Sequence, residues 1–89
     1  MTDGFILLAR DRADDSPTVR VGFTVTRKIG GAVIRNRLKR RLRAVVRDIV
    51  PTASVAGHDL VLIGREAGLA LDYARLAGDL ERAIGRAMR

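Results

Sequence analysis

The chain has 89 residues, which is enough for one small domain and too few for two. It contains no cysteine, which excludes disulfides and thiolate metal sites, and no apolar run reaches the roughly 20 residues that a membrane-spanning helix needs. These features predict a cytoplasmic protein. Lysine and arginine outnumber the acidic residues by 17 to 10, and the resulting net charge of +7 favours a polyanionic partner.

The N-terminal part of the chain predicts two strands. Residues 5–9 form a short apolar run, which is typical of a strand, and the polar residues 11–18 predict a loop. From residue 19 onward apolar and polar residues alternate, so that Val19, Val21, Phe23 and Val25 share one face of a second strand. We expect the two strands to pair with each other as an antiparallel hairpin.

A helix is predicted over residues 32–50. The glycines at 30 and 31 break the preceding strand, and Pro51 ends the helix. One face of this helix is apolar and should pack on the sheet. Its members recur at helical spacing and are Ile34, Leu38, Leu42, Val45 and Ile49.

The C-terminal part predicts a third strand and a second helix. Residues 60–63 are an unbroken apolar run, which suits a strand buried on both faces. Asp72 can cap a helix in which Tyr73, Leu76, Leu80 and Ile84 line the core side. The order of elements predicts an α/β (α+β) fold, built as a single two-layer ββαβα domain over residues 1–89.

The positive charge is concentrated in one segment. Residues 27–47 contain nine basic residues and no acidic one, whereas the other basic residues are interspersed with all ten acids. On the predicted helix this spacing creates like-charged neighbours such as Lys39 and Arg43, each pair unfavourable by a few tenths of a kcal/mol. Phosphate binding explains such a pattern better than a solvated helix face does, because arginine forks match phosphate oxygens.

Around the helix, Asn36, Arg40, Arg43 and Arg47 lie opposite the apolar stripe. Charge alone does not separate RNA from DNA, so a basic-helix nucleic-acid-binding module of ribosomal or DNA-binding type stays open. A stand-alone nuclease is the least favoured alternative, since the scattered acids do not suggest a two-metal site. His58, the single histidine, is expected at the surface, and we predict no catalytic or metal-binding residue.

Two stretches of the sequence resemble the signature of the bacterial ribonuclease P protein component. The first matches a strand of the type R-V-G-[LF]-[ST]-V-[ST]-K-K followed by a short G-x-A-V turn. The second matches a helix of the type R-N-R-x-K-R-x-x-R. The matching residues are Arg20-Val21-Gly22-Phe23-Thr24-Val25-Thr26-Arg27-Lys28, Gly30-Gly31-Ala32-Val33 and Arg35-Asn36-Arg37-Leu38-Lys39-Arg40-Arg41-Leu42-Arg43.

The resemblance implies a small mixed sheet with helices, of the ribosomal-protein-S5-domain-2-like class. It also implies an RNA-binding subunit that assists a catalytic RNA in removing the 5′ leader from precursor tRNA. In this family the RNA holds the active site and its Mg²⁺, and the protein binds no cofactor tightly. The RNA-binding residues that it implies are Lys28, Arg35, Asn36, Arg37, Lys39, Arg40, Arg43 and Arg47, and the candidates for a leader cleft are Leu8, Thr24 and Thr26.

The sequence departs from the family pattern in three places. Members of the family begin with a further helix that covers the sheet, and this sequence starts directly before the first strand. Leu8 stands where some relatives carry an aromatic residue, and Gly31 where many carry asparagine. From the first two departures we expect self-association through uncovered apolar surface and a weakened preference for leader-bearing substrates.

Overall fold

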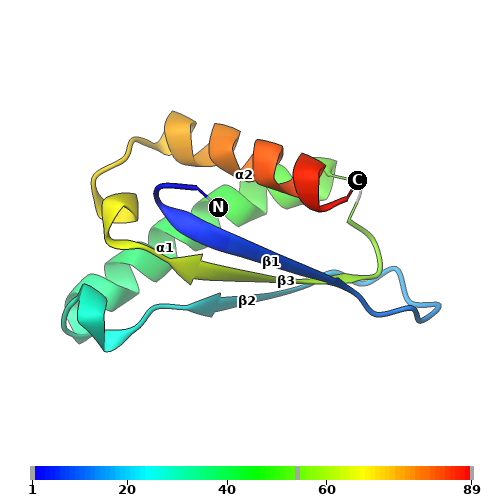
Figure 1. Cartoon of the computed structure of the whole chain (residues 1–89), viewed down its shortest axis with the longest axis horizontal. Coiled ribbons are helices and arrows are strands. Elements are labelled where there is room, and N and C mark those ends of the chain that lie inside the picture. The colour runs from blue at the N-terminus through cyan, green and yellow to red at the C-terminus, as the bar shows by residue number, and fades with distance from the viewer. Residues whose placement is uncertain (1, 54, 89) are drawn as a thin grey trace.

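The computed structural model describes residues 2–53 and 55–88, and it is a two-layer domain of one sheet and two long helices (Figure 1). Three short 3₁₀ turns connect the larger elements. The elements in chain order are β1 (Phe5–Asp11), β2 (Arg20–Thr24), η1 (Arg27–Ile29), α1 (Ala32–Ile49), η2 (Val50–Thr52), β3 (His58–Gly64), η3 (Glu66–Leu69) and α2 (Tyr73–Ala87). The predicted α+β order ββαβα is confirmed, and the sheet is mixed as expected.

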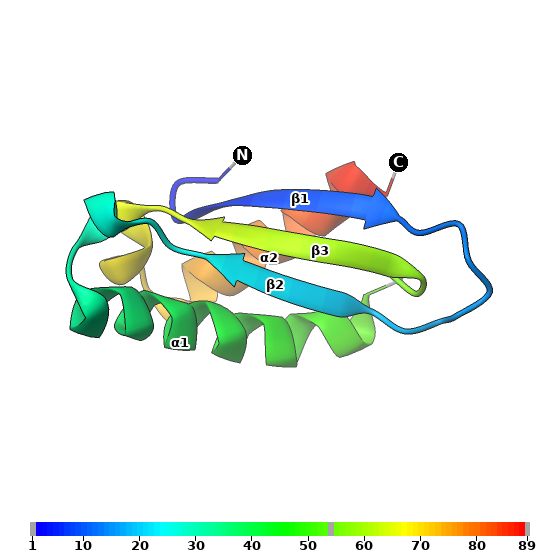
Figure 2. The same cartoon turned by 90° about the horizontal axis from the view of Figure 1, so that it is seen from below.

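The predicted hairpin of the first two strands is wrong. The strand order is β1–β3–β2, with β3 antiparallel to β1 and parallel to β2 (Figure 2). Alternating hydrophobicity shows which side chains share a face of a strand, but it does not identify the neighbouring strand. The most apolar strand, β3, takes the central position, and α1 provides the connection that two parallel strands require.

One face of the sheet carries the core. Phe5 of β1 and Leu60 and Leu62 of β3 are fully buried on this face, where they meet the helices. The expectation that β3 is buried on both faces is only half right, because Val61 and Ile63 point to the opposite face and stay partly exposed. Both helices pack on the same side, so the other face lies open to solvent among the described residues.

The helix α1 begins at Ala32 and ends at Ile49, one residue before the predicted end, and Pro51 lies in η2. Leu38, Leu42 and Val45 are fully buried, which confirms the predicted apolar face at its centre. At the first turn of α1 the predicted burial is wrong, because Ile34 is 41% exposed.

Helix α2 confirms the predicted cap and most of the predicted stripe. The Asp72 carboxylate accepts a hydrogen bond from the backbone N–H of Arg75 at 2.8 Å. Leu76, Leu80 and Ile84 are buried in the core. Tyr73 was expected there too, but its ring is 44% exposed and its hydroxyl donates to Asp48 of α1.

Two further features bear on the expected setting of the chain. In the described parts of the chain no helix has the length and apolar character to cross a membrane. Both outer strands of the sheet, β1 and β2, have one unpaired edge, and Leu8 on the open face is 52% exposed. Self-association through this surface therefore stays a prediction.

Candidate nucleic-acid interface

The packing of α1 fixes which of its basic side chains face outward. Because Leu38, Leu42 and Val45 are held in the core, the helix cannot rotate, and its opposite side points to solvent. We call the outward-facing set the basic face, and its exposed members are Asn36, Arg37, Arg40, Arg43 and Arg47. Arg35 and Lys39, also predicted to bind RNA, are half-buried along one edge of it.

Several arginines outside the basic segment are neutralised within the chain. Four of them form ion pairs with aspartates at 3.1 Å or less. They are Arg12, Arg20, Arg75 and Arg82. In residues 2–53 and 55–88, none of the ion pairs involves a basic residue of the segment 27–47. The positive charge of α1 is therefore left for something outside the chain.

The acid closest to this segment in sequence has a different partner. Asp48 accepts a hydrogen bond from the Tyr73 hydroxyl, which raises the pKa of Tyr73. The same hydroxyl lies 3.3 Å from the backbone oxygen of Ala44. Asp48 thus ties α1 to α2 and offers no counter-charge to the centre of the basic face.

Arg41 has a structural role that the sequence did not reveal. Its Nε donates to the backbone oxygen of Gly68 at 3.0 Å, and its Nη2 donates to the backbone oxygen of Leu71. These two carbonyls belong to η3 and the turn before α2, so the guanidinium links α1 to the start of α2. An arginine guanidinium has several N–H donors and can bond to both carbonyl oxygens at once. A helical wheel does not show these acceptors, because they lie in another part of the chain.

Two other arginines of α1 contact the body of the domain. The guanidinium carbon of Arg43 lies 5.7 Å from the centroid of the Phe23 ring on β2, within the range of a cation–π interaction. The Nε of Arg35 is buried, and it has no hydrogen-bond partner among the described residues. Burying an unmet donor costs free energy, so this position gains from an acceptor supplied by a ligand or by water.

The turn before α1 extends the cationic surface towards β2. Thr26, Arg27 and Lys28 are all exposed, with Arg27 and Lys28 in η1. Gly30 has a φ of 155°, a conformation that side-chain-bearing residues rarely adopt, and it allows the chain to reverse into the helix. Lys28, which the resemblance implies as an RNA-binding residue, lies beside the start of the basic face.

The predicted leader-cleft residues are brought together in part. Leu8 and Thr24 both lie on the open face of the sheet, in adjacent rows of the register. Leu8 aligns with Val61, and Thr24 aligns with Ile63. Thr26 lies beyond the end of β2 as the residue that precedes η1, so it is outside the sheet.

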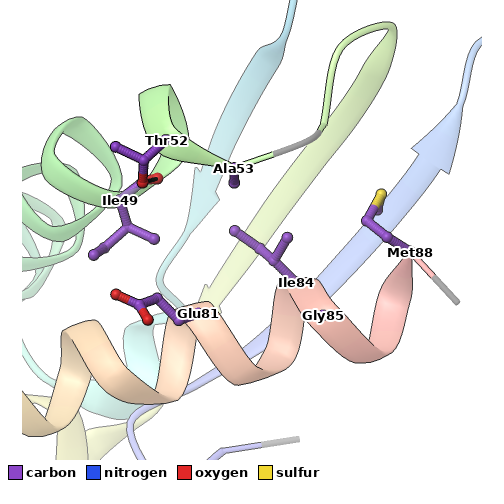
Figure 3. A pocket seen from close by; sticks show the side chains of 7 residues that line it. All are labelled: Ile49, Thr52, Ala53, Glu81, Ile84, Gly85 and Met88. Atoms are coloured by element: carbon purple, nitrogen blue, oxygen red, sulfur yellow. Dashed lines mark hydrogen bonds between the residues drawn. The ribbon is translucent and has the colours of Figure 1, made fainter.

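One pocket lies away from the basic face. It has a volume of about 370 Å³ and lies between the end of α1, η2 and the last turns of α2 (Figure 3). Ile49 and Ile84 point into it, and Glu81 is the charged side chain on its wall. None of the described residues that line it is basic, so the lining offers no cation to a phosphate.

His58 is half-buried rather than fully at the surface, and its Nδ1 lies 3.0 Å from the backbone oxygen of Ala56. In the part of the chain that the structure describes, no three His, Cys, Asp or Glu side chains are grouped so as to hold a metal ion. Among the described residues, the site is built from cationic side chains and the amide of Asn36.

Comparisons with known proteins agree on one family. The family model described as Ribonuclease P matches residues 1–88. The ribonuclease P protein component of Caulobacter vibrioides (strain NA1000 / CB15N) is 52% identical over 75 residues, covering 84% of this chain and 50% of the relative. That of Gluconacetobacter diazotrophicus is 49% identical over 84 residues, covering 94% of this chain and 72% of the relative.

The fold agrees with the sequence comparison. The RNase P protein from Thermotoga maritima superposes with a TM-score of 0.78 at 30% identity, covering 97% of this chain and 79% of that chain. The sequence thus matches only half of the Caulobacter relative's length and most of the Thermotoga structure.

Proposed function

The chain belongs to the ribonuclease P protein family, and from that premise we propose that it is the RNA-binding subunit of a ribonuclease P ribonucleoprotein. In this role it binds the catalytic RNA and assists the removal of the 5′ leader from precursor tRNA. The observation that carries the proposal is the basic face of α1, whose arginines have no acidic partner within the described residues.

The protein's part in the reaction is binding and electrostatics, and the RNA holds the active site with its Mg²⁺. Arg40, Arg43 and Arg47 neutralise phosphates and release counterions, which gives affinity. Asn36 lies among them as a neutral amide that both donates and accepts, and it is suited to a 2′-hydroxyl or a phosphate oxygen. By reducing phosphate repulsion around the RNA, the basic face also favours metal binding in the RNA nearby.

The open face of the sheet is the surface proposed for the single-stranded leader. Leu8 offers apolar contact and Thr24 a hydroxyl, while Thr26 and Lys28 lie where this face meets the basic face. Single-stranded RNA exposes base edges and faces that such a mixed surface can contact.

The decisive experiment is cleavage of precursor tRNA by the catalytic RNA at low Mg²⁺, with and without the chain. We expect the chain to restore cleavage at Mg²⁺ concentrations at which the RNA alone is slow. The matched control is a chain with Arg40→Gln and Arg43→Gln, which should give much less rescue. An equal cleavage rate with and without the chain would contradict the proposal.

A binding comparison separates the proposal from a general nucleic-acid-binding module. The catalytic RNA should bind more tightly than duplex DNA of similar length at the same salt concentration. Equal affinity for both would favour the module, and metal-dependent cleavage by the protein alone would favour a nuclease.

A further inference from the structure

A row of charged side chains crosses one end of the open sheet face. In the strand register Arg10 of β1 and Arg20 of β2 both align with Asp59 of β3. Aligned residues of neighbouring strands point to the same face, so these three side chains share the face that carries Leu8. With Arg12 and Asp14 they line a cavity of about 270 Å³, which we call the sheet-end cleft.

The acidic groups in the sheet-end cleft are already fully engaged. Arg20 forms a fork on Asp59, with Nε 2.8 Å from Oδ1 and Nη2 2.9 Å from Oδ2. Arg12 adds a third bond at 2.9 Å through Nη1. These guanidinium groups hold the pKa of Asp59 below its ordinary value, so the carboxylate stays charged at neutral pH. Asp14 pairs with Arg12 at 3.1 Å.

Arg12 is the buried support of the cleft. Its side chain is only 8% exposed, and its remaining donors bond to the backbone oxygens of His58 on β3 and of Ser16 and Thr18 in the loop between β1 and β2. Arg12 therefore has no donor left for a ligand, and its function is to hold Asp59 and the loop in place. The groups that face solvent are Arg10, Arg20 and Asp14, and the side chains of Arg20 and Asp14 are 66% and 49% exposed.

Arg10 is the surplus charge. The cleft contains three guanidinium groups and two carboxylates, so it has one positive charge more than its own acids neutralise. Arg10 is exposed, and it has no ion-pair or hydrogen-bond partner among residues 2–53 and 55–88 for its side chain. A guanidinium beside a polar hollow matches the oxygens of a phosphate group.

We propose that the sheet-end cleft binds a phosphodiester group of single-stranded RNA that lies along the open sheet face, with Arg10 as the direct contact and Asp59 as a positioning residue. The neighbouring rows of side chains on the sheet indicate which ligand the cleft would bind. Next to the charged row lie Leu8, Val61 and Gly22, an uncharged surface on which bases can rest while the backbone meets the arginines. The inference rests on the proposed function, because it assigns a second contact to the same leader-binding face.

The cleft and Thr24 mark the two ends of this surface. Thr24 lies four positions after Arg20 on β2, which corresponds to about 13 Å at a strand rise of about 3.3 Å per residue. A short single strand could therefore contact the hydroxyl near the basic face at one end and Arg10 at the other.

The test is binding of a single-stranded oligouridylate of about 8 nucleotides, within the usual site size of such proteins, over a salt series. With Arg10→Gln in the full chain, we expect the log–log salt slope to fall by about 0.7 and the affinity to drop about 4-fold near 0.15 M salt. Arg10→Lys, which keeps the charge, should retain most of the slope. Arg86→Gln removes the same charge from an exposed site on α2 and should leave the slope unchanged.

Binding of the catalytic RNA by the same variants separates this inference from the proposed function. Arg10→Gln should bind that RNA as the parent chain does. An unchanged oligouridylate slope in Arg10→Gln, or an equal loss in Arg86→Gln, would overturn the sheet-end cleft while the proposed function stands. Failure of the parent chain to bind the catalytic RNA would contradict the proposed function itself.

Discussion

The two long helices use the same residue type in opposite ways. In α2 the Asp79 side chain is only 8% exposed, and its two oxygens accept from Arg75 and Arg82. Arg75 reaches Asp3 as well, at 2.8 Å. In α1 a larger number of arginines has no such acid within the described residues. Arginines that lack an acidic partner within the described residues therefore indicate a polyanion-binding surface better than the presence of arginine alone does.

The comparison also shows what keeps each helix folded. On α2, Asp79 has arginines three and four positions away on the same side, which supports the helix. On α1, Lys39, Arg43 and Arg47 follow one another at a spacing of four and repel. Since α1 receives little help from its own charges, its stability comes from burial of its apolar face.

The largest expected effect comes from removing two charges of the basic face. Arg40→Gln with Arg43→Gln should weaken catalytic-RNA binding on the order of 20-fold near 0.15 M salt, and should flatten the log–log salt slope by between about 1.4 and 1.8. The melting temperature should change little, because relief of like-charge repulsion is offset by loss of the contact between Arg43 and Phe23. The double substitution Arg82→Gln with Arg86→Gln in α2 is the charge-matched control. An unchanged slope in the α1 double variant would show that α1 is not the contact surface.

The next prediction concerns the ion-paired arginines of α2. Asp79→Ala removes the buried acceptor of two arginines and should lower the free energy of unfolding by about 1 kcal/mol, a modest loss because both arginines can turn to water. Affinity for the catalytic RNA should be retained. The check is urea denaturation alongside RNA binding. A variant with full stability and altered RNA affinity would show that the α2 arginines serve RNA binding rather than folding.

A sharper comparison lies within α1 itself. Asn36→Ala should reduce RNA affinity by about 5-fold through the loss of one hydrogen-bonding amide. Arg41→Ala should reduce it less, although it removes a charge, because Arg41 is engaged with backbone oxygens of Gly68 and Leu71. Arg41→Ala should instead lower the melting temperature. The reverse ranking in RNA binding would mean that total charge governs the interface.

The smallest effect concerns acid stability. Asp59 has a lowered pKa in the folded chain because of Arg20 and then Arg12. Its contribution to stability is therefore complete above the ordinary aspartate pKa of about 3.9, and it is lost as the pH falls through the lower folded value. Asp59→Asn should be less stable than the parent at neutral pH, with the difference shrinking below about pH 4. A constant difference across that range would contradict the assignment.

The sequence predicted the elements well and their neighbours less well. Periodicity placed Leu38, Leu42 and Val45 in the core, and the acid-free segment located the basic face. It could not predict that β3 would insert between β1 and β2, because pairing is decided by residues far apart in the chain. Arg41 looked like its neighbours for the same reason, since its carbonyl partners at Gly68 and Leu71 come about 30 positions later.

The place of β3 in the sheet has a consequence for how the chain acquires its shape. The strand that joins the other two begins at His58, after β1, β2 and α1 have all been made. A growing chain on the ribosome therefore holds two edge strands and an arginine-rich helix before the strand that joins the two edges has been made. Such non-local pairing is typical of slow folding. We expect α1 to reach its final orientation only after β3 has been synthesised. RNA binding should therefore begin only when the sheet is complete.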